Sequence, residues 1–162
     1  LADSHLPMCR IIVAPQAVEE ALHAVFAEAN TPSSTHKHRL ITDIAQLADH
    51  FAALMSAKWL RLRLDVVTTN ACRKFHVDAV TARLICTYRG TGTQLGIAEN
   101  GNDPTDILTV PTGAVTVLRG TKWPTETHTA LRHRSPPIEG TGETRLMLIL
   151  DPLEAPMEEV CY

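Results

Sequence analysis

The stretch Leu60-Arg-Leu-Arg-Leu-Asp-Val66 alternates strictly between apolar and polar residues. An alternation of period two is typical of a β-strand that buries one face and exposes the other. This stretch also marks a change along the chain. Apolar residues before it recur at the three- and four-residue spacing of helices, and short β-like runs follow it. Helices first and strands afterwards indicate an α+β fold whose β part is a sandwich or barrel.

Residues 15–59 are expected to form two helices. Pro15 suits the first position of the first helix, and the turn formers that begin at Asn30 end it. Thr42 is the expected N-cap of the second helix. The second helix has an apolar stripe that we interpret as a packing face; its residues are Ile44, Leu47, Ala48, Phe51, Leu54 and Met55.

The rest of the chain is expected to form short strands separated by Gly, Pro, Asn and Asp. The last run, Leu146-Met-Leu-Ile-Leu150, is apolar on both faces and is therefore expected inside a sheet or between layers. Together with the stretch at Leu60, the predicted strands are Ala82–Tyr88, Gln94–Ala98, Ile107–Val110, Ala114–Leu118 and Arg145–Leu150.

Length and composition exclude several classes of protein. A chain of 162 residues that is 44% hydrophobic fits one domain, residues 1–162, with a helical part at about 15–59 and a β part at about 60–152. The net charge of −3 gives no indication of a nucleic-acid partner. No apolar run approaches the roughly 18 residues of a membrane span. The four cysteines form no C-x-x-C pair and no signal peptide is apparent, so a reduced, cytoplasmic protein is expected.

The stretch Cys72-Arg-Lys-Phe-His-Val-Asp78 carries the residues best suited to chemistry. On extended backbone His76 and Asp78 leave the same face, so an imidazole and a carboxylate are placed to share one cation. A third ligand must come from elsewhere in the chain, and His128 and His133 are the two candidates. Two histidines and one carboxylate on one side of a metal form the facial triad of non-haem Fe(II) oxygenases.

An H-x-D motif, a distant His and an Arg one strand later resemble the Fe(II)/2-oxoglutarate dioxygenase superfamily. That superfamily has a double-stranded β-helix fold. Four further motifs, between roughly Leu60 and Pro152, are similar to an uncharacterised bacterial family, a domain of unknown function. These motifs are C-x-x-F-H-V-D, T-Y-R-G-T-G-T, R-H-R-S-P-P and T-R-L-M-L-I-L-D.

The resemblance implies a fold, an activity and a set of ligands. The fold would be N-terminal helices packed on a double-stranded β-helix core of the jelly-roll or cupin type. The activity would be that of an Fe(II)- and 2-oxoglutarate-dependent oxygenase with a small-molecule cosubstrate. His76, Asp78 and His133 would then hold the iron, and Arg145 would pair bidentately with the distal carboxylate of 2-oxoglutarate. Tyr88 or Arg83 would reach the same pocket from the strand that follows the H-x-D motif; the two lie on opposite faces of that strand and would not share a role.

Two other functions fit the same residues. Cys72 lies four residues before His76, and a thiolate ligand favours zinc. Cys72 would complete a closed tetrahedral zinc site with the two histidines and Asp78. The alternative function is therefore a zinc-binding protein of metal homeostasis or regulation without oxygenase activity. A third possible function is that of a degenerate β-helix domain that acts through contacts with a partner.

Overall fold

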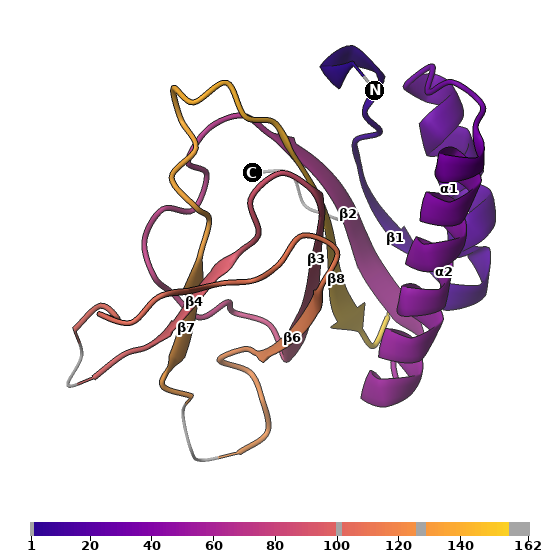
Figure 1. Cartoon of the computed structure of the whole chain (residues 1–162). Helices are drawn as coiled ribbons and strands as arrows, with labels where there is room; N and C mark the ends of the chain where they lie inside the picture. Colours follow the sequence, from indigo (N-terminus) through magenta and orange to yellow (C-terminus); the bar gives the residue numbers. More distant parts are fainter. Residues whose placement is uncertain (1, 100–101, 126–128, 156–162) are drawn as a thin grey trace, which may run out of the picture. The chain divides into compact units, whose positions relative to one another are not determined.

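The computed structural model of the chain describes residues 2–99, 102–125 and 129–155 (Figure 1). It contains α-helices, short 3-10 helices and mostly antiparallel β-sheets. In chain order the elements are η1 (Asp3–His5), β1 (Cys9–Val13), η2 (Pro15–Ala17), α1 (Val18–Glu28), α2 (Thr35–Met55), β2 (Trp59–Val67), β3 (Ala82–Arg89), β4 (Gln94–Ile97), β5 (Leu108–Thr109), β6 (Val115–Arg119), β7 (Leu131–Arg134) and β8 (Arg145–Leu153). From α1 onward, helices first and strands afterwards is the order that the sequence predicts, whereas β1 precedes the helices.

These elements divide between two compact units. The first unit comprises Leu1–Arg63 and Leu150–Tyr162, and the second comprises Leu64–Ile149. Strands β2 and β8 therefore contribute residues to both units. The expectation of one domain with helices packed on a β core concerns the relation between the units, and it stays a prediction.

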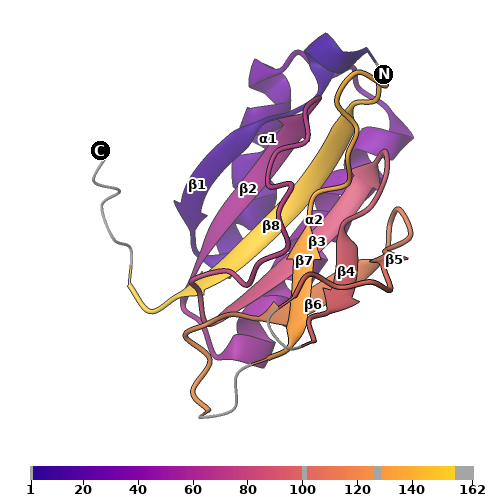
Figure 2. The ribbon, with the colours of Figure 1, turned by 90° about the vertical axis from the view of Figure 1, so that its left-hand side faces the viewer.

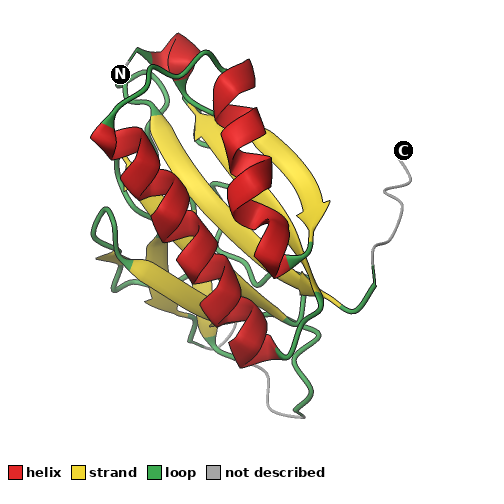
Figure 3. Ribbon diagram, turned by 90° about the vertical axis from the view of Figure 1, so that its right-hand side faces the viewer, coloured by secondary structure: helices red, strands yellow, loops and turns green. Residues whose placement is uncertain are grey.

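In the first unit, α1 and α2 lie on the same side of β1 (Figures 1 and 3). Apolar residues recur at three- and four-residue spacing in both sequences, so each helix has one apolar face, and this face is buried. Leu54, which belongs to the predicted stripe of the second helix, is 69% exposed instead. The fully or almost fully buried members are Val18, Leu22 and Phe26 of α1 and Ile41, Ile44, Ala48, Phe51 and Ala52 of α2.

The start of α2 corrects the sequence-based prediction. The helix begins at Thr35, and Ser34 is its N-cap: the Ser34 hydroxyl accepts a hydrogen bond from the Lys37 backbone N–H at 3.1 Å. Thr42, the predicted cap, lies inside the helix and is exposed. Residues 35–41 are mostly polar and hide the earlier start, because the apolar spacing becomes regular only after them.

Burial along β2 follows the predicted alternation. Leu60, Leu62 and Leu64 are fully buried, whereas the intervening residues Arg61 and Arg63 are half-buried. In the first unit the strand order is β1-β2-β8. Within this order Arg61 Nη1 lies 4.0 Å from Asp151 Oδ2.

The second unit contains two sheets that face each other (Figures 1 and 2). One sheet has the order β2-β8-β3-β6 and the other the order β5-β4-β7. Strands β3 and β6 pair antiparallel, with Ala82 opposite Arg119 and Cys86 opposite Val115. Strand β8 is buried along Arg145–Asp151, as its apolar sequence predicts.

Two strands were not expected. Strand β1 is a short run that includes Ile11-Ile-Val13, a β-branched sequence that is a recognisable signal. Strand β7 has the sequence Leu-Arg-His-Arg, in which only one residue is apolar. Its antiparallel pairing with β4, in which His133 lies opposite Leu95, supplies what the local sequence lacks.

No helix within the described residues has both the length and the apolar character that crossing a membrane requires.

Replacing Ser34 with Ala is expected to lower the free energy of unfolding by about 1 kcal/mol, because one N–H at the start of α2 loses its cap. Thr42→Ala is the matched control, since it removes a hydroxyl from the middle of the same helix and is expected to be neutral or slightly stabilising. Urea denaturation followed by circular dichroism measures both. A larger loss for Thr42→Ala than for Ser34→Ala would contradict this assignment of the helix start.

Candidate metal centre

The centre is organised by a direct pairing between the backbones of His76 and His133. The His76 N–H donates to the His133 carbonyl and the His133 N–H donates to the His76 carbonyl, both at 3.0 Å. Residues directly opposite each other in an antiparallel pair place their side chains on the same face. The two imidazole rings therefore meet, with ring centroids 4.4 Å apart.

Asp78 follows His76 by two residues, and its carboxylate lies on the same side. Its Oδ2 is 3.0 Å from His133 Nε2, and its Oδ1 is 3.6 Å from His76 Nε2. The three side chains offer ligand atoms that all lie within 4.8 Å of one another. The structure thus brings together the H-x-D pair and the distant histidine that the sequence predicted.

The end of β6 fixes the backbone around Asp78. The Thr121 N–H donates to the Asp78 carbonyl at 2.8 Å, and the Gly120 N–H donates to the Thr81 carbonyl. A Cβ at position 120 would lie 1.9 Å from the Val80 carbonyl oxygen. Only glycine permits this close approach of two backbones.

Two neighbours orient the ligand atoms. His76 Nδ1 lies 2.8 Å from the Lys74 carbonyl, so Nδ1 carries the proton and Nε2 is left with its lone pair. Arg83 Nη1 lies 2.5 Å from Asp78 Oδ1. The other carboxylate oxygen, Oδ2, is shielded from solvent and makes no hydrogen bond of good geometry within the described residues, although His133 Nε2 is near. Oδ2 is therefore the oxygen placed to bind a cation.

The surroundings keep the Asp78 carboxyl ionised. Burial raises its pKa, but the contact with His133 and the positive charge of Arg83 more than offset this, and the pKa lies below the ordinary value. At neutral pH the group is a carboxylate, the form that coordinates a metal.

The separations of the ligand atoms fit one metal ion. Two ligands that lie about 2.1 Å from an ion and 90° apart are about 3.0 Å from each other. The separation of 3.0 Å between Asp78 Oδ2 and His133 Nε2 meets this value, and the ligand atoms of all three residues lie within 4.8 Å of one another. Two imidazoles and one carboxylate suit Fe(II) and other first-row divalent metals.

Cys72, Tyr88 and His128 are the other predicted site residues that are not among the three converging ligands. Cys72 is exposed and is not among the ligand atoms that converge, so the structure does not bring it to the two histidines. Tyr88 is a half-buried residue of β3, and strand alternation puts its side chain on the face opposite that of Arg83. His128, the alternative third ligand, falls outside the described residues.

Arg145 is a fully buried cation. Its Nε donates to the Thr91 carbonyl at 2.6 Å, whereas Nη1 and Nη2 have no hydrogen-bond partner within the described residues. The nearby Glu143 does not fill this role, because its two oxygens accept hydrogen bonds from the backbone N–H and hydroxyl of Thr91. Burial lowers the pKa of Arg145 to about 10, and Glu143 opposes the shift, so the guanidinium is charged at neutral pH.

Arg83 contacts a predicted metal ligand, whereas the sequence indicated it only as an alternative to Tyr88 for reaching the pocket. A signal for it was present, because Arg83 is a charged residue near the start of an apolar strand, and a half-buried charge there requires a partner. The sequence did not say that this partner would be Asp78.

A comparison with family models matches almost the whole chain. The family described as "Protein of unknown function (DUF1826)" matches residues 1–151. No curated protein matches the chain. The hydroxypropylphosphonic acid epoxidase from S. wedmorenis is 16% identical, with a TM-score of 0.38 over 57% of this chain and 43% of the other. The chain therefore spans less than half the length of that enzyme.

A second solved structure covers most of the chain. It is the 2-oxoglutarate complex of AtDAO1, the dioxygenase for auxin oxidation 1 from Arabidopsis thaliana. The identity is 11%, and the TM-score is 0.56 over 93% of this chain and 64% of the other. This similarity is one of fold, and it confirms that the resemblance seen in the motifs extends to the structure.

Replacing Arg145 with Met is expected to leave the free energy of unfolding unchanged or to raise it by about 1–2 kcal/mol in protein without added ligands, because a buried charge with two unpaired nitrogens is costly. Arg83→Met is the matched comparison and is expected to lower it by about 1–3 kcal/mol, since Asp78 loses its partner. Chemical denaturation with EDTA present measures both. A loss for Arg145→Met as large as that for Arg83→Met would show that Arg145 is a structural residue.

Proposed function

We propose that this chain, which belongs to the DUF1826 family of proteins of unknown function, is a non-haem Fe(II)- and 2-oxoglutarate-dependent oxygenase. The observation that carries the proposal is the convergence of one carboxylate and two imidazoles within 4.8 Å. The arrangement is the facial triad typical of such enzymes. The fold similarity to AtDAO1 supports a double-stranded β-helix architecture for the β part.

His76, Asp78 and His133 would hold the iron. Fe(II), when bound, supplies the activation of dioxygen that drives the oxidative decarboxylation of 2-oxoglutarate and the oxidation of a second substrate. Arg83 would act through Asp78: by holding Oδ1 it leaves Oδ2 directed at the metal. The Lys74 carbonyl has the same role for His76, whose tautomer it sets.

Arg145 would bind the distal carboxylate of 2-oxoglutarate. Its Nε is already occupied by the Thr91 carbonyl, and this contact fixes the plane of the guanidinium. The two remaining nitrogens offer parallel N–H groups, the geometry that a carboxylate matches bidentately. Because these nitrogens are buried and unpaired within the described residues, the carboxylate would replace a missing partner rather than displace an existing one.

The metal assignment is tested by titrating Fe(II) under argon into protein stripped with EDTA. We expect one equivalent to bind, and His76→Ala, Asp78→Ala and His133→Ala each to weaken binding at least tenfold, since removal of a ligand costs more than loss of an outer partner. Cys72→Ala is the control and is expected to bind as the parent does, because Cys72 lies outside the group.

Other metals give the opposing outcomes. If Zn²⁺ binds and resists dialysis, and if Cys72→Ala abolishes that binding, the oxygenase proposal fails in favour of a closed zinc site. If the three ligand variants bind Fe(II) like the parent, these residues are not a metal centre.

The cosubstrate is tested separately, by calorimetric titration of 2-oxoglutarate into the Fe(II)-loaded protein under argon. Arg145→Gln is expected to weaken binding about 100-fold, because two charge-assisted hydrogen bonds are lost. Arg145→Lys is the matched variant, because it keeps the positive charge but lacks the planar guanidinium. Its affinity for 2-oxoglutarate is expected to lie between those of the parent protein and Arg145→Gln. Stoichiometric iron without any 2-oxoglutarate binding would contradict the oxygenase proposal while leaving the metal site intact.

A further inference from the structure

The second unit has a cavity on the reverse side of the segments that hold the metal ligands. Its volume is about 150 Å³. Val77, between His76 and Asp78, lines the cavity, and so does Arg132, which precedes His133. Neighbouring residues of an extended chain point to opposite faces, so these two side chains lie away from the metal centre. The cavity is therefore separate from the site proposed for iron.

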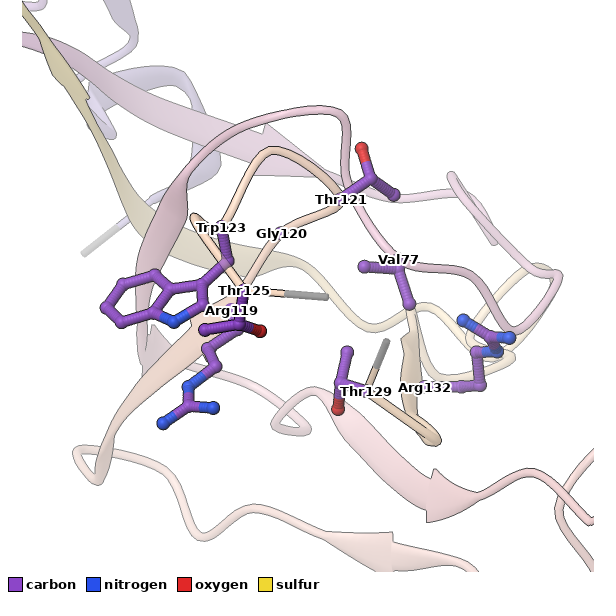
Figure 4. A pocket seen from close by; sticks show the side chains of 8 residues that line it. All are labelled: Val77, Arg119, Gly120, Thr121, Trp123, Thr125, Thr129 and Arg132. Carbon is purple, nitrogen blue, oxygen red and sulfur yellow. The ribbon is translucent and has the colours of Figure 1, made fainter. Parts of the chain in front are cut away.

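The described lining of this cavity carries positive charge and includes no acidic side chain. Figure 4 shows Arg119 and Trp123 on one side of it and Arg132 and Val77 on the other. The Arg119 guanidinium lies 5.0 Å from the centre of the Trp123 ring, which holds it in place. Arg132 has no ion pair or side-chain hydrogen bond within the described residues, and no Asp or Glu is among the described lining residues.

The remaining lining of the cavity is polar and of limited size. Thr121, Thr125 and Thr129 contribute hydroxyl-bearing side chains. A cavity of about 150 Å³ accommodates a molecule the size of benzene. Two arginines set a preference for a carboxylate or a phosphate, whose oxygens match the guanidinium fork.

We propose that this cavity binds a small organic anion that carries a carboxylate or phosphate group on at most one ring. The site does not depend on the metal, because its side chains leave the opposite face of the backbone. It is nevertheless joined to the metal centre by one hydrogen bond, in which the Thr121 N–H donates to the Asp78 carbonyl. A ligand in the cavity would therefore contact the segment whose backbone holds Asp78, a metal ligand, in position.

Phenyl phosphate, benzoate and the neutral benzamide are the probes, titrated into EDTA-treated full-length protein. The Trp59→Phe variant leaves Trp123 as the chain's one tryptophan, so its fluorescence reports on the cavity, and calorimetry provides an independent measurement. We expect saturable binding of at least one anion and binding of benzamide at least about tenfold weaker, because benzamide lacks the charge. Which anion binds more tightly identifies the preferred group.

Arg132→Gln and, as a second variant, Arg119→Gln are each expected to weaken anion binding at least about tenfold. Arg39→Gln, on the exposed surface of α2, removes the same charge elsewhere and is expected to have no effect. Three results would overturn the proposal: no saturable binding of either anion, benzamide binding as tight as that of the anions, or equal weakening by Arg39→Gln. Because the metal is stripped with EDTA and the chelator is removed before the titration, failure here is independent of the iron proposal.

Discussion

Two backbone hydrogen bonds between His76 and His133 connect segments that are far apart in the sequence, and both proposed sites depend on this pairing. Side chains alternate across the pair, so the histidines face one side while Val77 and Arg132 face the other. A slip of one residue in the segment that holds His133 would exchange His133 and Arg132 between the two faces. The His133 imidazole would then leave His76 and Asp78, and Arg132 would leave the cavity. One register thus specifies the metal centre and the anion cavity together.

The local sequence was enough to predict those elements whose own residues have a regular pattern of apolar and polar side chains. The alternation along β2 and the apolar run of β8 were predicted and are seen. The pairing of His76 and Asp78 on one face followed from the same period of two. Strand β7 was missed because its four residues include three polar ones and because its partners, Leu95 and His76, are distant in the sequence.

Ligand types were predictable from the sequence, but their neighbours were not. Cys72 was placed with His76 on the ground of a spacing of four residues. In the structure Cys72 is exposed, and its sulfur is not among the ligand atoms that converge. Arg83 was expected only to reach the pocket as an alternative to Tyr88: it lies five residues from Asp78, beyond a turn, and only the folded chain brings its guanidinium to Oδ1. The path of the chain between two motifs decides such contacts, and this path cannot be derived from the number of residues that separate the motifs.

The buried charges also bear on the choice between the two metal hypotheses. Asp78 Oδ2 lacks a well-formed hydrogen bond and Arg145 lacks partners for two nitrogens, within the described residues. Each missing hydrogen-bond partner lowers the free energy of unfolding, and proteins keep such unfavourable groups mainly at functional sites. A zinc ion at the two histidines and Asp78 would satisfy the carboxylate but leave the guanidinium unpaired. Iron together with a dicarboxylate would satisfy both residues, because the iron would bind the Asp78 carboxylate and the dicarboxylate would pair with the Arg145 guanidinium.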